Sequence, residues 1–183
     1  MRFRFALLII AAAATAACDD GFGPQPWDAT PDTITLFSAS RLDLLGQPTA
    51  YDFVNRITIR VEQPGTANGW DVLLSGTSAL QLNPASAFQG QNSRAAIATI
   101  TNATFDALTE APGDTASYST NPITIQTGGV YVVRTRRYAC SFSTAVNFAK
   151  IKAVSVDAAA GKARFAVVRN PYCNDRSFVP PED

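Results

Sequence analysis

The strongest constraint on the fold is a two-residue alternation of apolar and polar side chains. The clearest case is Phe53–Val61, where apolar residues such as Ile57 and Ile59 share one parity and polar or basic residues share the other. Residues of one parity face the same side of a β-strand, so this pattern predicts half-buried strands. No long segment keeps a helical period of 3.6 residues. Short helical pieces are expected only near Ala39–Leu45 and Ala103–Leu108.

Further strands are predicted where Val, Ile, Thr, Phe and Tyr gather between Gly, Pro, Asn or Asp residues. These segments are Thr33–Phe37, Trp70–Leu74, Ala95–Thr101, Ile123–Thr127, Gly129–Arg137, Asn147–Val156 and Lys162–Arg169. We expect Asp157–Gly161 to be the hairpin loop between the last two. The pattern predicts an all-β domain, an antiparallel sandwich or a curled meander with few short helical turns. A length of 183 residues suits one domain, which we place at residues 33–183.

The N-terminal segment has the features of a bacterial lipoprotein signal. Arg2 and Arg4 precede the apolar run Phe5–Ala14, which is too short to span a membrane, since spanning takes about 20 residues. Small residues then lead to Cys18, an ending that resembles a lipobox, although Thr15 stands where such signals usually carry Leu. We therefore expect cleavage before Cys18 and lipidation of this residue. The alternative is an ordinary secretory signal in which Cys18 is incidental.

Lipidation would divide the chain into three parts. Residues 1–17 form the cleaved signal peptide, and residues 18–32 form the lipidated N-terminus and a flexible tether. Three prolines and two glycines between Asp19 and Asp32 disfavour regular structure in that tether. Lipobox lipoproteins carry several acyl chains, so the resemblance implies stable anchorage in the cell envelope. We expect the outer membrane or cell surface rather than the inner membrane.

The cysteine count predicts one disulfide bond. Three cysteines are an odd number for a secreted protein, and assigning Cys18 to lipid leaves Cys140 and Cys173 as a pair. Disulfides persist in the envelope, so we expect these two residues to be joined. The rival interpretation is a metal or redox pair. It is weaker because the chain has no histidine and no Cys-x-x-Cys spacing.

Missing residue types limit the chemistry of the domain. The chain has no histidine, and its one methionine is Met1, within the predicted signal. Histidine-dependent catalysis, histidine-ligated zinc and haem held by histidine or methionine are thereby excluded. Asp106 and Glu110 remain as a possible acid/base pair, although a solvated turn near Ala111–Gly113 is the simpler explanation. We expect no enzymatic activity, no cofactor and no metal.

Charge is unevenly distributed along the chain. Residues 19–114 carry eleven acidic and four basic side chains, whereas residues 115–183 carry four acidic and nine basic ones. After signal removal, 13 basic side chains face 15 acidic ones, a balance that argues against nucleic-acid binding. If neighbouring strands pair, one basic patch could bind an anionic small ligand, a lipid headgroup or an acidic protein partner; otherwise these residues are a solvated strand end. The patch would consist of Arg134, Arg136, Arg137, Lys150 and Lys152.

Three short segments resemble a known family. Val130–Arg137 and Phe148–Ile151 look like paired strands of HmuY-type envelope lipoproteins, and Gly69–Val72 looks like the Trp-Asp segment of that family. The resemblance implies an all-β fold anchored by an N-terminal lipid. It does not transfer haem capture, which in that family depends on two histidines that this chain lacks.

These observations predict a lipid-anchored envelope protein with a non-catalytic β domain that binds a ligand or partner. The alternative is a structural or assembly lipoprotein without a small-molecule ligand. A concave apolar pocket with a few convergent polar groups would favour ligand binding. An exposed apolar patch or a free edge strand would favour assembly.

Overall fold

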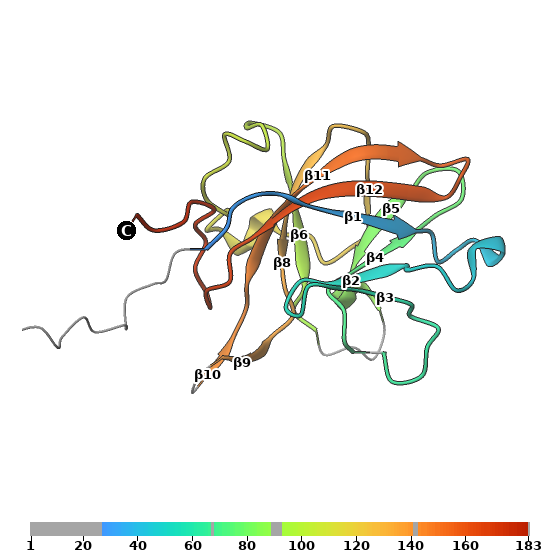
Figure 1. Cartoon of the computed structure of the whole chain (residues 1–183), viewed down its shortest axis with the longest axis horizontal. Coiled ribbons are helices and arrows are strands. Elements are labelled where there is room, and N and C mark those ends of the chain that lie inside the picture. The colour runs from blue at the N-terminus through green and yellow to red at the C-terminus, as the bar shows by residue number, and fades with distance from the viewer. Residues whose placement is uncertain (1–26, 67, 89–92, 141–142, 183) are drawn as a thin grey trace, which may run out of the picture.

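The computed structural model describes residues 27–66, 68–88, 93–140 and 143–182. Within these ranges the protein is all-β, with antiparallel sheets and isolated 3-10 turns as its helical content, which confirms the predicted fold class (Figure 1). Cys18, the predicted signal and the tether as far as Pro26 lie outside the described residues.

Two antiparallel sheets pack face to face as a sandwich. The first has the order β1 (Asp32–Phe37), β12 (Lys162–Arg169), β11 (Phe148–Asp157), β8 (Val130–Arg134), β6 (Ala96–Ile100). The second has the order β3 (Ile57–Ile59), β2 (Ala50–Asp52), β4 (Val72–Ser75), β5 (Gln81–Pro84), β7 (Ile123–Thr124). The remaining elements are the hairpin of β9 (Tyr138–Cys140) and β10 (Ser143–Ala145) and the 3-10 turns η1 (Leu42–Leu44), η2 (Ala85–Ala87) and η3 (Thr115–Ser117).

The main core lies between the two sheets and follows from strand alternation. Ala163, Phe165 and Val167 share one parity of β12 and are buried against residues of the second sheet such as Leu74 and Leu82. The other parity of β12 points away from the second sheet. We call this side of the first sheet the outer face.

The outer face is divided into a covered half and an open half. Residues 101–122 and the C-terminal tail, residues 170–182, pack over the covered half, where Tyr118 and Phe178 contact Val132 and Phe148. Trp27, at the start of the described chain, packs nearby against the cluster around Phe105. The open half lies farther along the β11–β12 hairpin toward its turn (Figure 1).

One predicted strand is wrong in its extent. Phe53–Val61 is not continuous, because the chain turns before β3 begins at Ile57. The Asp52 carboxylate accepts hydrogen bonds from the N–H groups of Val54 at 2.9 Å and Asn55 at 3.0 Å, which fixes a turn. The alternation continues through this turn in the sequence, and so the pattern alone does not reveal it.

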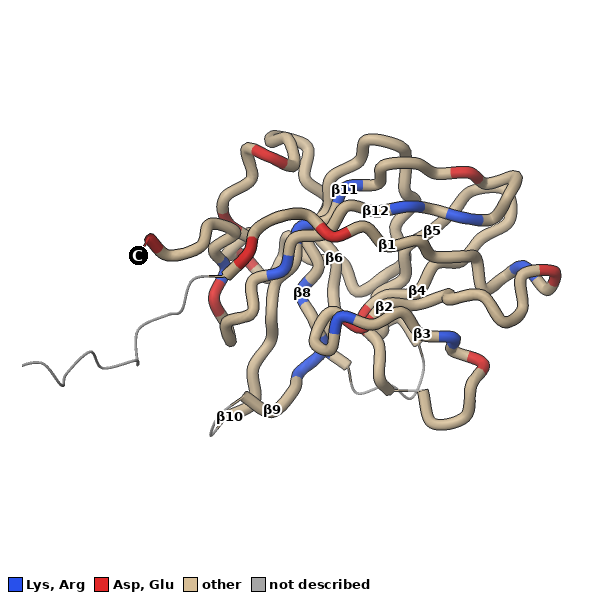
Figure 2. The backbone as a smooth tube through the Cα atoms, in the orientation of Figure 1, with Lys and Arg blue, Asp and Glu red and all other residues tan. Residues whose placement is uncertain are grey.

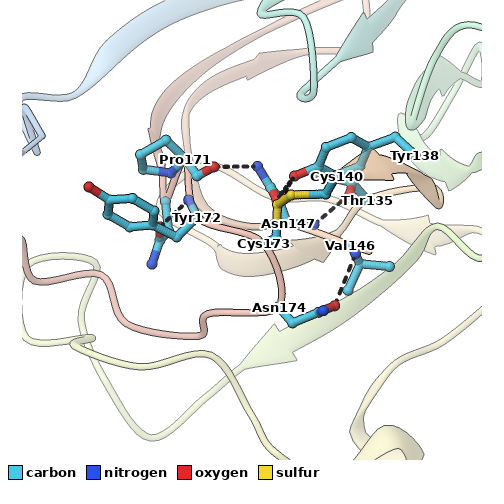
Figure 3. Close-up of a disulfide and its surroundings, with 10 residues drawn as sticks. Thr135, Tyr138, Cys140, Val146, Asn147, Pro171, Tyr172, Cys173 and Asn174 are labelled. Carbon is cyan, nitrogen blue, oxygen red and sulfur yellow. Dashed lines mark hydrogen bonds between the residues drawn. A yellow bond between two sulfur atoms is a disulfide. The ribbon is translucent and has the colours of Figure 1, made fainter. Parts of the chain in front are cut away.

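The predicted disulfide is confirmed. Cys140 of β9 is joined to Cys173 of the tail, with their Cα atoms 6.5 Å apart (Figure 3). Beside it, Asn147 accepts a hydrogen bond from the Tyr138 hydroxyl and donates one to the Pro171 carbonyl at 3.4 Å. The bond and these contacts hold the tail where it covers the first sheet.

Candidate functional site

The five basic residues predicted as a patch are not gathered on one surface. β8 and β11 do pair, with Arg134 opposite Phe148 and Lys150 opposite Val132. Arg136, however, follows the end of β8 and is directed at the second sheet. Its guanidinium donates to both carboxylate oxygens of Asp52, at 2.7 and 2.9 Å.

A second carboxylate completes this ionic network. Asp71 is fully buried, and its oxygens accept hydrogen bonds from the backbone N–H groups of Phe53 and Arg136, both at 2.7 Å, and from the Arg136 guanidinium at 3.2 Å. Burial raises the pKa of Asp71 to about 6, although Arg136 opposes the shift. Burial also raises the pKa of Asp52, but hydrogen bonds from Arg136 and Asn55 outweigh it and hold that pKa below its usual value.

The network is a structural link between the sheets. Buried charges are tolerated when they are paired and hydrogen-bonded, and every carboxylate oxygen here accepts at least one hydrogen bond. Asp71, from the Trp-Asp segment Gly69–Val72, is thus in direct contact with Arg136, which follows the end of β8. Arg136 is unavailable for an external anion because its charge is already neutralised by two carboxylates.

Lys150 is likewise used inside the fold. It is 8% exposed, and its Nζ donates to the carbonyls of Phe105 and Leu108, each at 3.0 Å. The same ammonium lies 5.0 Å from the centroid of the Phe105 ring and 5.7 Å from that of Phe178. Burial lowers the pKa of Lys150. The side chain fastens residues 105–108 to the covered half.

Arg134 and Arg137 do not restore the patch. The Arg134 guanidinium lies 5.2 Å from the centroid of the Tyr118 ring, and its Nε donates to the Arg94 carbonyl at 3.3 Å. Arg137 is exposed beyond the strand end. Of the five predicted residues, Lys152 alone lies on the open half.

Two basic residues outside the predicted patch lie beside Lys152 on the open half. Lys152 faces Ala166 in register, and Arg164 and Lys162 follow on the same face of β12. Diagonal cross-strand neighbours lie roughly 7–8 Å apart and alternate residues of a strand roughly 7 Å apart, so the three cations form a short stripe. Figure 2 shows basic residues along β11 and β12. The sequence does contain a sign of this stripe, because Lys162 and Arg164 alternate with the apolar residues of the predicted strand and so share one face.

The stripe is not neutralised within the described part of the chain, where none of its three residues forms an ion pair. Asp157 lies opposite Lys162 in register, but its Oδ1 accepts a hydrogen bond from the Ala160 N–H at 2.8 Å. That carboxylate stabilises the hairpin turn. We call Lys152, Lys162 and Arg164 the basic stripe.

An open groove adjoins the stripe at Lys152. It has a volume of about 540 Å³ and lies between residues 99–105 and residues 126–131. Hydroxyl and amide groups dominate its polar lining, and Phe105 and Val130 contribute apolar surface. The lining includes Thr99, Thr101, Thr104, Gln126, Thr127 and Lys152. A cation beside several neutral donors is suited to an anionic group carried on a polar molecule.

The possible acid/base pair is not a buried dyad. Asp106 and Glu110 are both exposed, and Glu110 forms an ion pair with Arg176 at 2.5 Å. In the residues that the structure describes, no cluster of three or more histidine, cysteine or carboxylate side chains could hold a metal ion.

Neither models of protein families nor curated proteins give a match to this chain. Among the described residues there is also no helix with the length and apolar character needed to cross a membrane.

Proposed function

We propose that this chain is a lipid-anchored bacterial envelope protein whose β-sandwich binds an anionic ligand or partner group without catalysis. The single observation that carries the binding proposal is the basic stripe, three cations without an ion-pair partner in the described chain. Cations on an exposed sheet face usually have anionic neighbours, because like charges on adjacent strands repel. An external anion would offset this repulsion.

The groove supplies the rest of the argument for a ligand. Lys152 lies at its edge, so an acidic group held by Lys152 would leave the remainder of the ligand against the threonine hydroxyls and Gln126. The groove is open and combines polar and apolar surface, which suits an acidic glycan or an acidic polymer better than a compact, wholly apolar molecule. The anchor is supported by the lipobox-like sequence before Cys18.

Binding is tested with a panel of acidic oligosaccharides, carboxylated and sulfated, measured by calorimetry. Lys152→Ala combined with Arg164→Ala should raise the Kd by about tenfold or more, since a hydrogen bond to a charged group contributes roughly 1.5–3 kcal/mol. The matched control is Arg60→Ala, because Arg60 is exposed just after β3 and away from the basic stripe. Equal loss in the control, or no binding by the unaltered protein, would refute the site.

Lipidation is tested separately in cells. Cys18→Ala should move the domain from the membrane fraction to the soluble envelope fraction or leave the signal uncut, and labelled palmitate should no longer be incorporated. A Cys18→Ala protein that is processed and sedimented with membranes as before would contradict the anchor. Binding and anchorage can therefore fail independently.

Assembly remains a second candidate because of one apolar turn. Leu42 is 80% exposed and Leu45 is 68% exposed at η1, which lies at the opposite end of the molecule from the start of the described chain (Figure 1). Exposed leucines this close together are typical of a contact surface. Leu42→Ser with Leu45→Ser should abolish partner association in crosslinking if this turn is the contact, and should leave oligosaccharide binding unchanged.

A further inference from the structure

A second open groove lies between the edge strands of the two sheets, β1 of the first and β3 of the second. It has a volume of about 630 Å³. Buried Ile34 and Tyr51 form its floor, and exposed Thr33, Ile57 and Thr58 form its rim. This groove shares no lining residue with the one beside Lys152.

The backbone of β1 carries unpaired donors along its free edge, beside this groove. Ser38 donates its N–H on the β12 side, at 2.7 Å, whereas Phe37 donates to the Pro48 carbonyl on the opposite side, at 2.8 Å. Hydrogen-bonding direction alternates along a strand, so the N–H groups of Thr33 and Thr35 point the same way as that of Phe37. Neither N–H has a hydrogen-bond partner within the described residues.

The opposite wall of the groove, β3, also has unpaired backbone groups. β3 pairs with β2 and is the last strand of its sheet, so one row of its backbone groups is unpaired as well. Exposed edge strands are templates for pairing with another chain. An extended peptide carries N–H and C=O groups on both of its edges, and so it can satisfy two such walls together.

We propose that this groove is the docking site for an extended peptide segment of a partner protein, which adds as a strand along β1. Alternate side chains of the segment would point toward Ile34 and Tyr51, so the segment should be apolar at every second position. Only Thr33–Leu36 of β1 are free to pair, because the Arg56–Asp32 ion pair stands at one end and the Phe37 N–H is bonded to Pro48 at the other. This stretch spans roughly 13 Å, which sets the length of the paired segment.

The boundaries of the groove favour a thin segment over a second folded copy of this chain. The Phe37–Pro48 hydrogen bond closes one end, and the ion pair between Arg56 and Asp32 stands at the other. β3 occupies the side opposite β1. A folded edge strand brings its own sheet with it, whereas a flexible segment enters as a single chain.

The experiment uses amide hydrogen exchange of the disulfide-bonded domain, followed by NMR. The probe is a set of synthetic eight-residue peptides that alternate valine or phenylalanine with threonine between terminal lysines. In the free domain, Thr33 and Thr35 should exchange rapidly, while Ile34 and Leu36, which pair with β12, should be protected. Bound peptide should slow exchange at Thr33 and Thr35 by about tenfold or more.

Two matched controls isolate backbone pairing at this groove. A peptide of the same sequence, methylated on alternate backbone nitrogens, keeps its side chains but loses donors and should give no protection. Ile57→Lys places a charge at the rim and should weaken binding about tenfold, whereas Val154→Lys should not. The two residues are comparably exposed, at 51% and 42%, but Val154 lies on the β11 side of the first sheet. Protected Ile34 and Leu36 amides verify that each variant is folded.

Three results would overturn the proposal. One is unchanged exchange at Thr33 and Thr35 at saturating peptide. Another is equal weakening by Ile57→Lys and Val154→Lys. The third is protection without peptide that increases with protein concentration, which would assign the groove to a second copy. Loss of oligosaccharide binding in the Lys152 and Arg164 variant has no bearing on any of them.

Discussion

Lys150 and Lys152 are two residues apart on β11 and point to the same face, yet their surroundings are opposite. Lys150 is buried, donates to two carbonyls and lies against two aromatic rings. Lys152 has no ion-pair partner in the described chain and borders an open groove. Both side chains point to the same face of β11. Residues 101–122 and the C-terminal tail cover Lys150 and leave Lys152 accessible. Lys150 is a structural residue, whereas Lys152 is available for the binding that we propose.

The largest expected effect comes from removing the disulfide that holds the tail over the covered half. Cys140→Ser with Cys173→Ser removes a crosslink across a sequence separation of 33 residues. On the chain-entropy estimate, the free energy of unfolding should fall by about 3–4 kcal/mol. Denaturant unfolding of the oxidised protein and the variant measures it. If the disulfide acts by holding the tail, amide hydrogen exchange in the variant should increase most in residues 170–178. A uniform increase over the whole domain would contradict that role.

A smaller effect on stability is expected when the two lysines are replaced one at a time. Lys150→Met keeps an unbranched stem but leaves the Phe105 and Leu108 carbonyls without their donor, which should reduce the free energy of unfolding by about 1–3 kcal/mol. Lys152→Met serves as the matched control and should stay within about 0.5 kcal/mol of the unaltered protein, as surface changes usually do. Equal destabilisation in urea titrations would mean that the two halves do not differ as described.

The smallest expected effect is a difference in the rate at which the lysine side chains are acetylated. The chain contains three lysines, and all of them lie on β11 or β12. Brief acetylation followed by peptide mass spectrometry should modify Lys152 and Lys162 about tenfold faster than Lys150, because burial withholds its ammonium from the reagent. In the variant without the disulfide, the rate at Lys150 should approach that of the other two. Rapid acetylation of Lys150 in the oxidised protein would be inconsistent with a covered half.

Strand alternation and turn residues were sufficient to predict the all-β class and the last hairpin. Lys162–Arg169 shows why, since its parity separates buried Ala163 and Phe165 from exposed Lys162 and Arg164. The predicted turn at Asp157–Gly161 also lies between β11 and β12. These features are local, so a short window of sequence contains them.

The candidate site was much less predictable, for a physical reason. Residues 101–122 and the tail are mostly irregular, and irregular segments leave no periodic pattern to show which face they cover. Consequently Lys150 looked as available as Lys152. Arg136 is similar, because its partners Asp52 and Asp71 are 84 and 65 residues away in the sequence. Pairing over such separations is a property of the assembled sandwich.

The pairing of β1 with β12 has a consequence for how the domain forms. Phe37 pairs with Lys162, so 125 residues separate these partners along the chain. β11 and β12 can form their hairpin early because a short turn joins them, but β1 must wait until the last strand has been synthesised. Until then β1 exposes both of its edges, and a nascent chain is most exposed to mispairing at this strand. Completion of the first sheet is thereby tied to the arrival of the C-terminal strand.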